Sequence, residues 1–415
     1  MARESIITGI DIGSSMIRVV VGQKNAADET LQVIGVGETD SEGISKGIIT
    51  GIEDAVSCIS KALEKAERMT GIPIEHAFVG IGGTHIISQD SHGVIAVSKA
   101  DGEIKEEDVE RVIEAAQAVA TPPNYEILHV IPRSFTVDDQ RGIKDPIGMS
   151  GIRLEVDAQI IQGLSAQIKN ITKSVYRTSV DINDLVLGVL ASAESTLSKR
   201  QKELGVTLVN IGSVTTSVMV FEEGDVLHTA ILPIGAGHIT NDIAIGLRTS
   251  IEIAEKIKLE YGSALPKEFS KHQDIDLSQI DESEDGLVSQ KQVAEIIEAR
   301  LEEIYKMVDK ELKEIDRSGL LPAGVVLTGG GSKLPGMVEV AKRVFKLPCT
   351  IGYPGEIMTA IDKVKDPSFS VAVGLVLWGG QLQDKQGGKK AFNTDFSSVS
   401  KATDKMKNWF KSLMP

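Results

Sequence analysis

The chain has 415 residues, 41% of them hydrophobic and 25% charged, which is an ordinary globular balance and enough length for two large lobes with separate cores. Its net charge of −15 argues against general nucleic-acid binding. The two cysteines, Cys58 and Cys349, lie in unrelated contexts, so they form neither a disulfide framework nor a metal motif, and a reducing cytoplasm is expected.

The chain opens on an antiparallel meander with a tight turn. Its strands are predicted at residues 6–12, 17–22 and 31–37. The first turn holds Gly13, Ser14 and Ser15, and such glycine and serine turns form concave anion sites from successive N–H and hydroxyl groups. A carboxylate at the end of the first strand, Asp11, can hold the waters of a Mg²⁺ ion. Together with Arg18 in the second strand, these residues are a candidate phosphate site.

Residues 85–165 have the pattern of an inserted α+β module. A helix at 51–69 and a strand at 77–81 come before it and place helices on the faces of the first sheet. The predicted elements of the insertion are strands at 86–88 and 93–97, a helix at 105–120, and strands at 125–135 and 153–162. On physical grounds alone, residues 142–151 are a surface loop of this module.

The first hairpin has a second, similar copy. An apolar strand runs through Asn210 into Gly212, Ser213, Val214 and Thr215, and both copies carry Ile-Gly-Ser at the same place. We interpret this as an internal duplication, in which the two turns face each other and clamp a nucleotide polyphosphate. The elements between the insertion and this hairpin are predicted as a helix at 168–176, a strand at 185–190 and an inter-lobe helix at 191–203.

A third glycine-rich loop follows a buried strand at 325–328. It consists of Gly329, Gly330, Gly331 and Ser332, and a helix is predicted to start near Met337. Without a Cβ in the way, a flat base or ribose can lie against such a backbone. Between the second hairpin and this loop, a glycine turn is predicted at 231–240, followed by a helix from about Thr240 whose N-terminus favours anions. Helices are also predicted at 250–261 and 290–316, with a polar stretch and short strands at 263–289. The helix at 290–316 is amphipathic, and its core stripe is Val293, Ile296, Ile297, Leu301, Ile304 and Val308.

In this order, the two hairpins and the glycine loop resemble the actin-like ATPase superfamily. The resemblance implies an α/β, actin-like two-lobe fold with a nucleotide cleft, and ATP with Mg as cofactors. It also implies that Gly235 and Gly237 lie near the terminal phosphate. In the Ala-Glu-x-x-Lys pattern, Glu255 and Lys258 are expected to contact the ribose and base.

Further motifs are very similar to those of the FtsA family, the actin homologues of bacterial cell division. They are His129-Val130-Ile131-Pro132, Gly142-Ile143-Lys144-Asp145-Pro146, Gly148-Met149-Ser150-Gly151 and Gly43-Ile44-Ser45-Lys46-Gly47-Ile48-Ile49. In that family the insertion is subdomain 1C, which carries filament and late-division-protein contacts. The resemblance implies that Arg300 and Glu303 contact the C-terminal peptide of FtsZ, the tubulin-like division protein. It also implies that the protein lies on the cytoplasmic face of the cell membrane at the division site.

The resemblance and the predicted elements together suggest a domain organisation. The expected units are lobe 1 core (1A) at 1–84, subdomain 1C at 85–165, lobe 1 core with the inter-lobe connector at 166–204, lobe 2 core (2A) at 205–238, subdomain 2B at 239–317, lobe 2 core again at 318–364, a returning connector at 365–383, a flexible linker at 384–399 and an amphipathic helix at 400–415.

The end of the chain has a different pattern from the rest. A buried helix is predicted at 371–378, and the Gly-, Gln-, Lys- and Ser-rich residues after it indicate a linker. The final helix has apolar residues on one face and lysines mostly on the other, which is typical of an anchor on anionic membrane lipids. Its candidate membrane residues are Lys405, Met406, Trp409, Phe410, Lys411, Leu413 and Met414. One such helix binds weakly, so the tail also predicts polymerisation, since many anchors add by avidity.

The sequence departs from the superfamily at the second hairpin. Asn210 stands where Asp is expected, and Ser213 and Val214 replace glycine, so ATP binding with slow hydrolysis is expected. Gln159 stands where many FtsA members have His. Two alternatives remain at this stage. A phosphotransferase of the sugar-kinase branch would need a substrate-binding Asp in the cleft, and a pilus-assembly scaffold would lack both the tail and the motif at 142–155.

Overall fold

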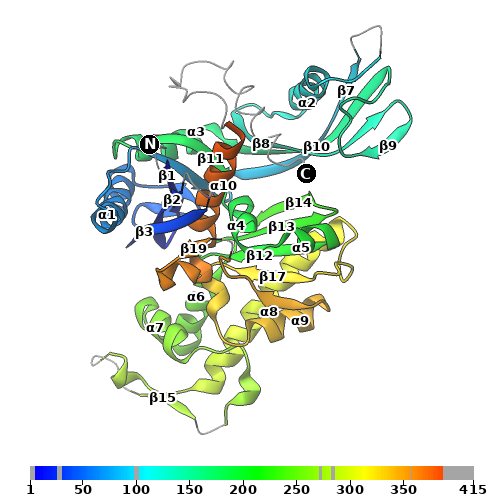
Figure 1. Ribbon diagram of the computed structural model, residues 1–415. Coiled ribbons are helices and arrows are strands. Elements are labelled where there is room, and N and C mark those ends of the chain that lie inside the picture. Colours follow the sequence, from blue (N-terminus) through cyan, green and yellow to red (C-terminus); the bar gives the residue numbers. More distant parts are fainter. Residues whose placement is uncertain are drawn as a thin grey trace.

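The computed structural model describes residues 5–25, 30–97, 102–270, 273–281, 286–355 and 357–386. Figure 1 shows two lobes, one above the other, and a smaller sheet that projects sideways from the upper lobe. Two helices, α4 and α10, run between the lobes. The arrangement follows from where the chain buries its apolar faces.

The first lobe is built on a six-stranded sheet in the order β11-β6-β1-β2-β3-β19. Its strands are β1 (Ser5–Ile12), β2 (Met16–Lys24), β3 (Leu31–Asp40), β6 (His76–Ile81), β11 (Asp181–Leu187) and β19 (Met358–Thr359). The predicted antiparallel meander is confirmed as β1, β2 and β3, and β6 pairs parallel to β1. Helices α1 (Ile52–Thr70) and α3 (Ser165–Tyr176) complete this lobe, with a short ribbon of β4 (Ile44–Ser45) and β5 (Ile48–Ile49).

The insertion is a four-stranded sheet in the order β7-β10-β8-β9 with one helix. Its elements are β7 (Ile86–Ala96), α2 (Glu106–Ala120), β8 (Tyr125–Val137), β9 (Gln140–Ile143) and β10 (Arg153–Leu164). The prediction of two strands at 86–88 and 93–97 is wrong, because β7 is one strand paired along its whole length with β10. The polar residues Gln89, Asp90 and Ser91 break the apolar pattern without breaking the strand, since this part of β7 is largely exposed.

The second lobe repeats the strand order of the first. Its sheet runs β14-β13-β12-β17-β18, with β12, β13 and β14 antiparallel and β17 parallel to β12. The strands are β12 (Val206–Ile211), β13 (Thr216–Glu222), β14 (Asp225–Leu232), β17 (Val325–Thr328) and β18 (Cys349–Ile351). This matches β3-β2-β1-β6-β11 strand for strand, as the predicted duplication requires.

Four helices and a small ribbon cover the second lobe and extend it downward in Figure 1. They are α6 (Ala236–Leu247), α7 (Ile251–Tyr261), α8 (Gln290–Glu314), α9 (Met337–Phe345), β15 (Asp274–Asp276) and β16 (Leu287–Ser289). The predicted core stripe of α8 is confirmed at Val293, Ile297, Leu301 and Ile304, which are all fully buried. The predicted helix start at Met337 is also confirmed.

Two predictions around the first connector need correction. The strand predicted at 185–190 ends at Leu187, and the helix predicted at 191–203 is two helices, α4 (Gly188–Thr196) and α5 (Lys199–Leu204). Ser198 interrupts the helix because its side chain accepts the N–H of Gln201 and so begins α5 as an N-cap. The apolar pattern of residues 185–190 does not show where the strand ends and the helix begins.

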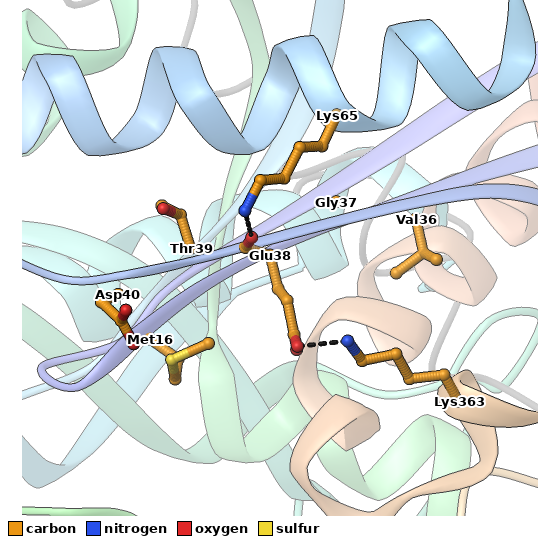
Figure 2. A pocket seen from close by; sticks show the side chains of 8 residues that line it. All are labelled: Met16, Val36, Gly37, Glu38, Thr39, Asp40, Lys65 and Lys363. Carbon is orange, nitrogen blue, oxygen red and sulfur yellow. Dashed lines mark hydrogen bonds and ion pairs between the residues drawn. The ribbon is translucent and has the colours of Figure 1, made fainter.

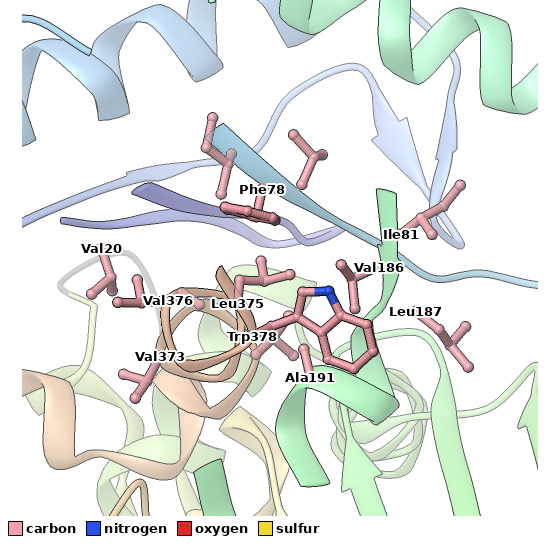
Figure 3. Packing of buried hydrophobic residues seen from close by; sticks show 14 of the residues in the cluster. Val20, Phe78, Ile81, Val186, Leu187, Ala191, Val373, Leu375, Val376 and Trp378 are labelled. Atoms are coloured by element: carbon pink, nitrogen blue, oxygen red, sulfur yellow. The ribbon is translucent and has the colours of Figure 1, made fainter. Parts of the chain in front are cut away.

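The helix α10 (Ser370–Gln386) packs closely against α4 at Gly374. A Cβ on Gly374 would lie 1.8 Å from the carbonyl oxygen of Ala191, so only glycine permits this approach. Figure 3 shows α10 residues such as Leu375, Val376 and Trp378 under the first sheet, with Ala191 beside Trp378. One apolar core therefore includes the first sheet, both connectors and part of β12 and β13.

The linker was predicted to begin directly after residue 378, and that boundary is wrong. The helix continues to Gln386 because Gly379 packs on the first lobe, where a Cβ would lie 2.5 Å from the Phe78 ring and 2.6 Å from Ile7 Cγ2. The helix also overlaps the start of the proposed linker at 384–399. The remaining linker and the predicted helix at 400–415 lie outside the described residues. Within the described ranges, no helix is both long and apolar enough to cross a membrane.

Candidate functional site

The third glycine loop sits directly on the second hairpin. Gly329 has φ +85°, and a Cβ on it would lie 2.3 Å from Asn210 Oδ1. A Cβ on Gly331 would lie 2.7 Å from Ile211 Cγ2 and 2.9 Å from Ala236 Cβ. Side chains cannot approach that closely, so these two glycines bring the loop and the hairpin into contact.

The glycine turn before α6 packs on the same hairpin. The N–H groups of Ala236 and Gly237 donate to the carbonyl oxygens of Gly212 at 2.9 Å and Ser213 at 2.6 Å. The helix therefore begins at Ala236 and not near Thr240 as predicted, because the hairpin satisfies N–H groups that lack partners inside a helix. These two N–H groups are consequently not free to bind an anion. Gly235 N–H is also occupied, by His238 Nδ1 at 3.1 Å.

The first hairpin holds its turn in a similar way and keeps its hydroxyls near the surface. Gly13 N–H donates to the carbonyl of Met16 at 3.1 Å, as Gly212 N–H does to Thr215 at 2.9 Å. Ser14 Oγ accepts a hydrogen bond from Gly47 N–H at 3.0 Å. Ser15 is exposed, and Ser213 and Thr215 in the second hairpin are half-buried. Both turns therefore present serine or threonine side chains.

Asp11 lies opposite Arg18 on the paired strands β1 and β2. Burial raises the pKa of the Asp11 carboxyl to about 6, and the Arg18 guanidinium lowers it. The burial effect is the larger of the two, so the charged carboxylate is poorly stabilised by its surroundings. A cation or its bound water at this carboxylate would favour the charged form.

Arg18 is held by other protein groups. Its Nε lies 3.7 Å from Glu38 Oε2, and its guanidinium lies 5.2 Å from the centre of the Phe369 ring. Glu38 is also ion-paired with Lys363, and its carbonyl accepts a hydrogen bond from Lys65 at 2.7 Å, as Figure 2 shows. Arg18 is thus part of a row of charges across the sheet.

Two cavities of about 430 Å³ each open near these segments. The cavity in Figure 2 touches the first hairpin only at Met16, and the other follows residues 332–339 beside the glycine loop. Among the described lining residues, neither cavity includes Asp11, Asn210 or Glu255. The described part of the chain also contains no cluster of three His, Cys, Asp or Glu side chains able to hold a metal.

The segment just before α10 connects the first hairpin with the glycine loop. The carbonyl of Pro367 accepts Gly329 N–H at 3.2 Å and Thr328 Oγ1 at 3.3 Å. Phe369, two residues on, carries the Arg18 contact. A Cβ on Gly330 would meet only Ser368 Cβ, at 3.7 Å, so Gly330 is open on that face. The candidate residues of the two lobes therefore meet around residues 367–369.

Asn210 ties the second hairpin to both connectors. Its Nδ2 donates to Ser192 Oγ in α4 at 2.8 Å, and Ser192 Oγ lies 3.2 Å from Ser370 Oγ in α10. Ser192 and Ser370 are fully buried. The amide of Asn210 thus serves as a donor here, which a carboxylate at this position would not do.

The predicted ribose and base residues on α7 contact each other. Lys258 Nζ donates to Thr240 Oγ1 at 2.8 Å and to Glu255 Oε2 at 2.6 Å. Lys258 is only 7% exposed, whereas the Glu255 side chain is 42% exposed. Glu255 is therefore the more accessible of the two side chains, and Lys258 lies behind it.

Sequence reasoning missed Phe369, Ser192 and Ser370. A single phenylalanine or serine next to an apolar helix has no distinguishing pattern, so only the contacts reveal them. Gly47 did have a signal, because it lies in one of the motifs noted in the sequence.

Comparisons with known proteins match nearly the whole chain. A family model described as "Cell division protein FtsA" matches residues 207–374, and one described as "SHS2 domain inserted in FTSA" matches residues 83–162. Cell division protein FtsA of Pseudomonas aeruginosa is 39% identical over 407 residues, which cover 97% of each chain. FtsA of Bacillus subtilis is 40% identical over 392 residues, which cover 94% of this chain and 87% of that protein. The chain belongs to the FtsA family.

Other matches support the same assignment. FtsA of Escherichia coli K12 is 31% identical over 415 residues, covering 98% of this chain and 96% of that protein. The resemblance noted in the sequence is thereby confirmed, and the protein is an actin-like cell-division protein. The phosphotransferase and pilus-scaffold alternatives are not supported, because the relatives that match nearly the whole chain are cell division proteins.

Solved structures agree on the fold alone. The PilM-PilN type IV pilus biogenesis complex has a TM-score of 0.67 at 16% identity, covering 90% of this chain and 98% of that chain. MreB5 of Spiroplasma citri bound to AMPPNP has a TM-score of 0.55 at 12% identity, covering 92% and 98%. The predicted actin-like fold is confirmed, and this ATPase fold implies nucleotide binding.

The predicted FtsZ contacts of this FtsA-family chain lie on α8. Arg300 forms a two-pronged ion pair with Asp242 of α6, with its second nitrogen 2.8 Å from Asp242 Oδ1, and bonds Glu303 at 2.5 Å. The Arg300 side chain is 23% exposed and that of Glu303 is 56% exposed. The predicted membrane residues, from Lys405 to Met414, lie outside the described residues.

Proposed function

We propose that this FtsA-family protein binds ATP with Mg²⁺ between its two hairpins. Ser14, Ser15, Ser213 and Thr215 would donate to the phosphates, and the open face of Gly330 would accept the adenosine. Gly13 and Gly212 shape the turns, and Gly329 and Gly331 hold the loop against the second hairpin. Ser332 Oγ donates to the Gly329 carbonyl at 2.8 Å and so stabilises the loop itself. Glu255 would contact the ribose, with Lys258 behind it.

This proposal rests on the contacts that the glycine loop makes with both lobes. Gly329 contacts Asn210 on one side and bonds Pro367 on the other, and Phe369 reaches Arg18 in the first hairpin. A ligand between the hairpins would therefore touch one continuous set of contacts. Such a ligand favours whichever lobe arrangement it binds more tightly.

Asp11 is the residue we propose for Mg²⁺, through a bound water. Its carboxyl has a pKa raised to about 6 by burial, so a nearby cation would offset a cost already present in the fold. The ion would supply charge to neutralise the phosphates. Asn210 lacks the charge of Asp and already donates to Ser192, which supports binding with slow hydrolysis.

We further propose that the protein polymerises at the membrane, tethers FtsZ filaments to the inner leaflet and recruits later divisome proteins. Residues 400–415 would bind anionic lipids, Arg300 and Glu303 would contact the FtsZ C-terminal peptide, and the insertion at 85–165 (subdomain 1C) would contact divisome proteins and neighbouring subunits. In the same scheme, residues 239–317 form subdomain 2B. Because one amphipathic helix binds weakly, polymerisation would strengthen attachment through avidity.

Co-pelleting with liposomes tests this proposal. Full-length protein and a chain truncated after Gln386, where α10 ends, would be mixed with vesicles containing phosphatidylglycerol, with and without ATP and Mg²⁺. We expect only the full-length protein to pellet, and to pellet more strongly with ATP. Equal pelleting of both chains would show that the tail is not the anchor. If ATP has no effect, nucleotide binding in the cleft does not promote polymerisation at the membrane.

A further inference from the structure

The motif at residues 43–49 has no role in the function described so far. It forms the ribbon of β4 and β5, whose Ile44 and Ile49 are buried in the first lobe. At the tip of the ribbon, Lys46 and Gly47 have φ values of +53° and +73°. The tip is therefore a tight turn on a ribbon that the core holds in place.

One side of this turn contacts the first hairpin. Gly47 N–H donates to Ser14 Oγ at 3.0 Å. A serine hydroxyl that accepts this bond still has its own proton to donate. The bond thus restrains the Ser14 side chain and leaves its O–H available for a ligand oxygen.

The other side of the turn contacts the place where the chain enters and leaves the inserted sheet, at residues 82–86 and 162–165. We call these residues the root of the inserted sheet. A Cβ on Gly47 would lie 1.9 Å from the carbonyl oxygen of Gly82, and a Cβ on Gly83 would lie 2.5 Å from that of Lys46. Thr84 N–H donates to the Lys46 carbonyl at 3.2 Å. The two turns are therefore in direct backbone contact, with no side chain between them.

The root is also where the insertion enters and leaves the first lobe. Leu164 N–H donates to the carbonyl of His85 at 3.2 Å, so the strands that enter and leave are tied together. A displacement of Thr84 relative to the first lobe would move both ends of the inserted sheet, since Thr84 directly precedes His85.

We infer that the turn at Lys46 and Gly47 positions the Ser14 hydroxyl for a phosphate and couples occupancy of the first hairpin to the root of the inserted sheet. Gly47 is then a positioning residue, and the insertion responds to nucleotide through backbone contacts. This inference rests on the proposed binding of ATP at the hairpins. The coupling acts within one chain, from the first hairpin to the inserted sheet.

Hydrogen–deuterium exchange with a non-hydrolysable ATP analogue and Mg²⁺ tests the coupling. Peptides covering residues 82–86 and 162–165 would be followed in the full-length protein and in the Ser14→Ala and Gly47→Ala variants. Ser88→Ala is a matched control, because this exposed side chain lies on β7 just beyond the root. Ser45→Ala is a second control, since this exposed side chain lies on the same ribbon.

We expect the analogue to slow exchange at the root in the unmodified protein and in both controls. In Ser14→Ala and Gly47→Ala the affinity should fall about tenfold, which is the effect of losing a hydrogen bond of ordinary strength. At saturating analogue, the root of these variants should no longer respond. This second readout distinguishes coupling from a merely weaker site.

The outcomes distinguish the coupling from the proposed ATP binding on which it rests. If the unmodified protein binds no nucleotide, both the ATP-binding proposal and the coupling are wrong. If it binds nucleotide but the root responds equally in all variants, only the coupling fails. Should Gly47→Ala not fold, as judged by circular dichroism, Ser14→Ala decides the question alone.

Discussion

Thr229 in β14 donates a hydrogen bond to Gln159 Oε1 in β10 at 3.0 Å, and both side chains are buried, with exposures of 4% and 1%. This bond joins the inserted sheet to the second lobe, although the insertion is covalently part of the first. Nearby, Lys144 of the insertion pairs with Asp225 at the start of β14. Rotation of one lobe against the other must therefore break these contacts or move the insertion.

Replacing Gln159 should destabilise the protein. In Gln159→Leu the buried Thr229 hydroxyl loses its acceptor, which should lower the free energy of unfolding by about 1–3 kcal/mol. Urea denaturation would measure it, with the exposed Gln140→Leu as the control. In a double-mutant cycle, adding Thr229→Val should cost little more. Fully additive losses would show that the two side chains do not interact.

Replacing Asp11 should change how stability depends on pH. Its folded pKa of about 6 lies above the ordinary value of 3.8, so the ligand-free fold loses stability as pH rises between these values. Asp11→Asn removes that loss. Its stabilising effect should therefore be larger at pH 8 than at pH 5, by roughly 1–1.5 kcal/mol.

Thermal unfolding of the nucleotide-free protein at both pH values would check this. The exposed Asp139→Asn is the control for a general effect of removing a negative charge. A gain from Asp11→Asn that is equal at pH 5 and pH 8 would mean that burial does not raise the pKa of this carboxyl.

Alanine should destabilise the fold at Gly331 but not at the adjacent Gly330. Gly331→Ala places a Cβ 2.7 Å from Ile211 Cγ2 and should cost about 1–3 kcal/mol of stability through overpacking. Gly330→Ala meets only Ser368 Cβ at 3.7 Å, so its melting temperature should stay close to that of the unmodified protein. If adenosine lies on Gly330, the affinity of the Gly330→Ala variant for ATP should nevertheless fall. Unchanged affinity in this variant would show that the base does not lie on Gly330.

Charges on the apolar face of the tail should abolish membrane binding. Trp409→Glu and Phe410→Glu each replace a large apolar side chain with a carboxylate, which anionic lipids repel. Each variant should pellet with phosphatidylglycerol vesicles at least tenfold less, on the order expected from losing one buried aromatic side chain. Their ATP affinity should be unchanged. Asn408→Glu is the control for the added charge, because the predicted helix places residue 408 opposite its apolar residues. An equal loss in this variant would show that the added charge alone weakens binding.

The sequence by itself determined the repeated meander, the amphipathic face of α8 and the three glycine segments. Each depends on local residue order: apolar alternation predicts strands, a 3.6-residue period predicts helices, and glycine marks close backbone approach. The motifs at 129–155 and 43–49 were sufficient to indicate the family.

Only the tertiary structure decided where several elements begin and end, and which groups remain free. β7 is one strand because β10 pairs with all of it, α6 begins at Ala236 because the second hairpin accepts its first N–H groups, and α10 reaches Gln386 because Gly379 packs on the first lobe. Likewise, Arg18 and Lys258 look like free cations in the sequence, but Arg18 is paired with Glu38 and Lys258 donates a hydrogen bond to Thr240 of α6. The physical reason is the same in each case: the partner that satisfies the hydrogen bond, charge or apolar face lies far away in the chain.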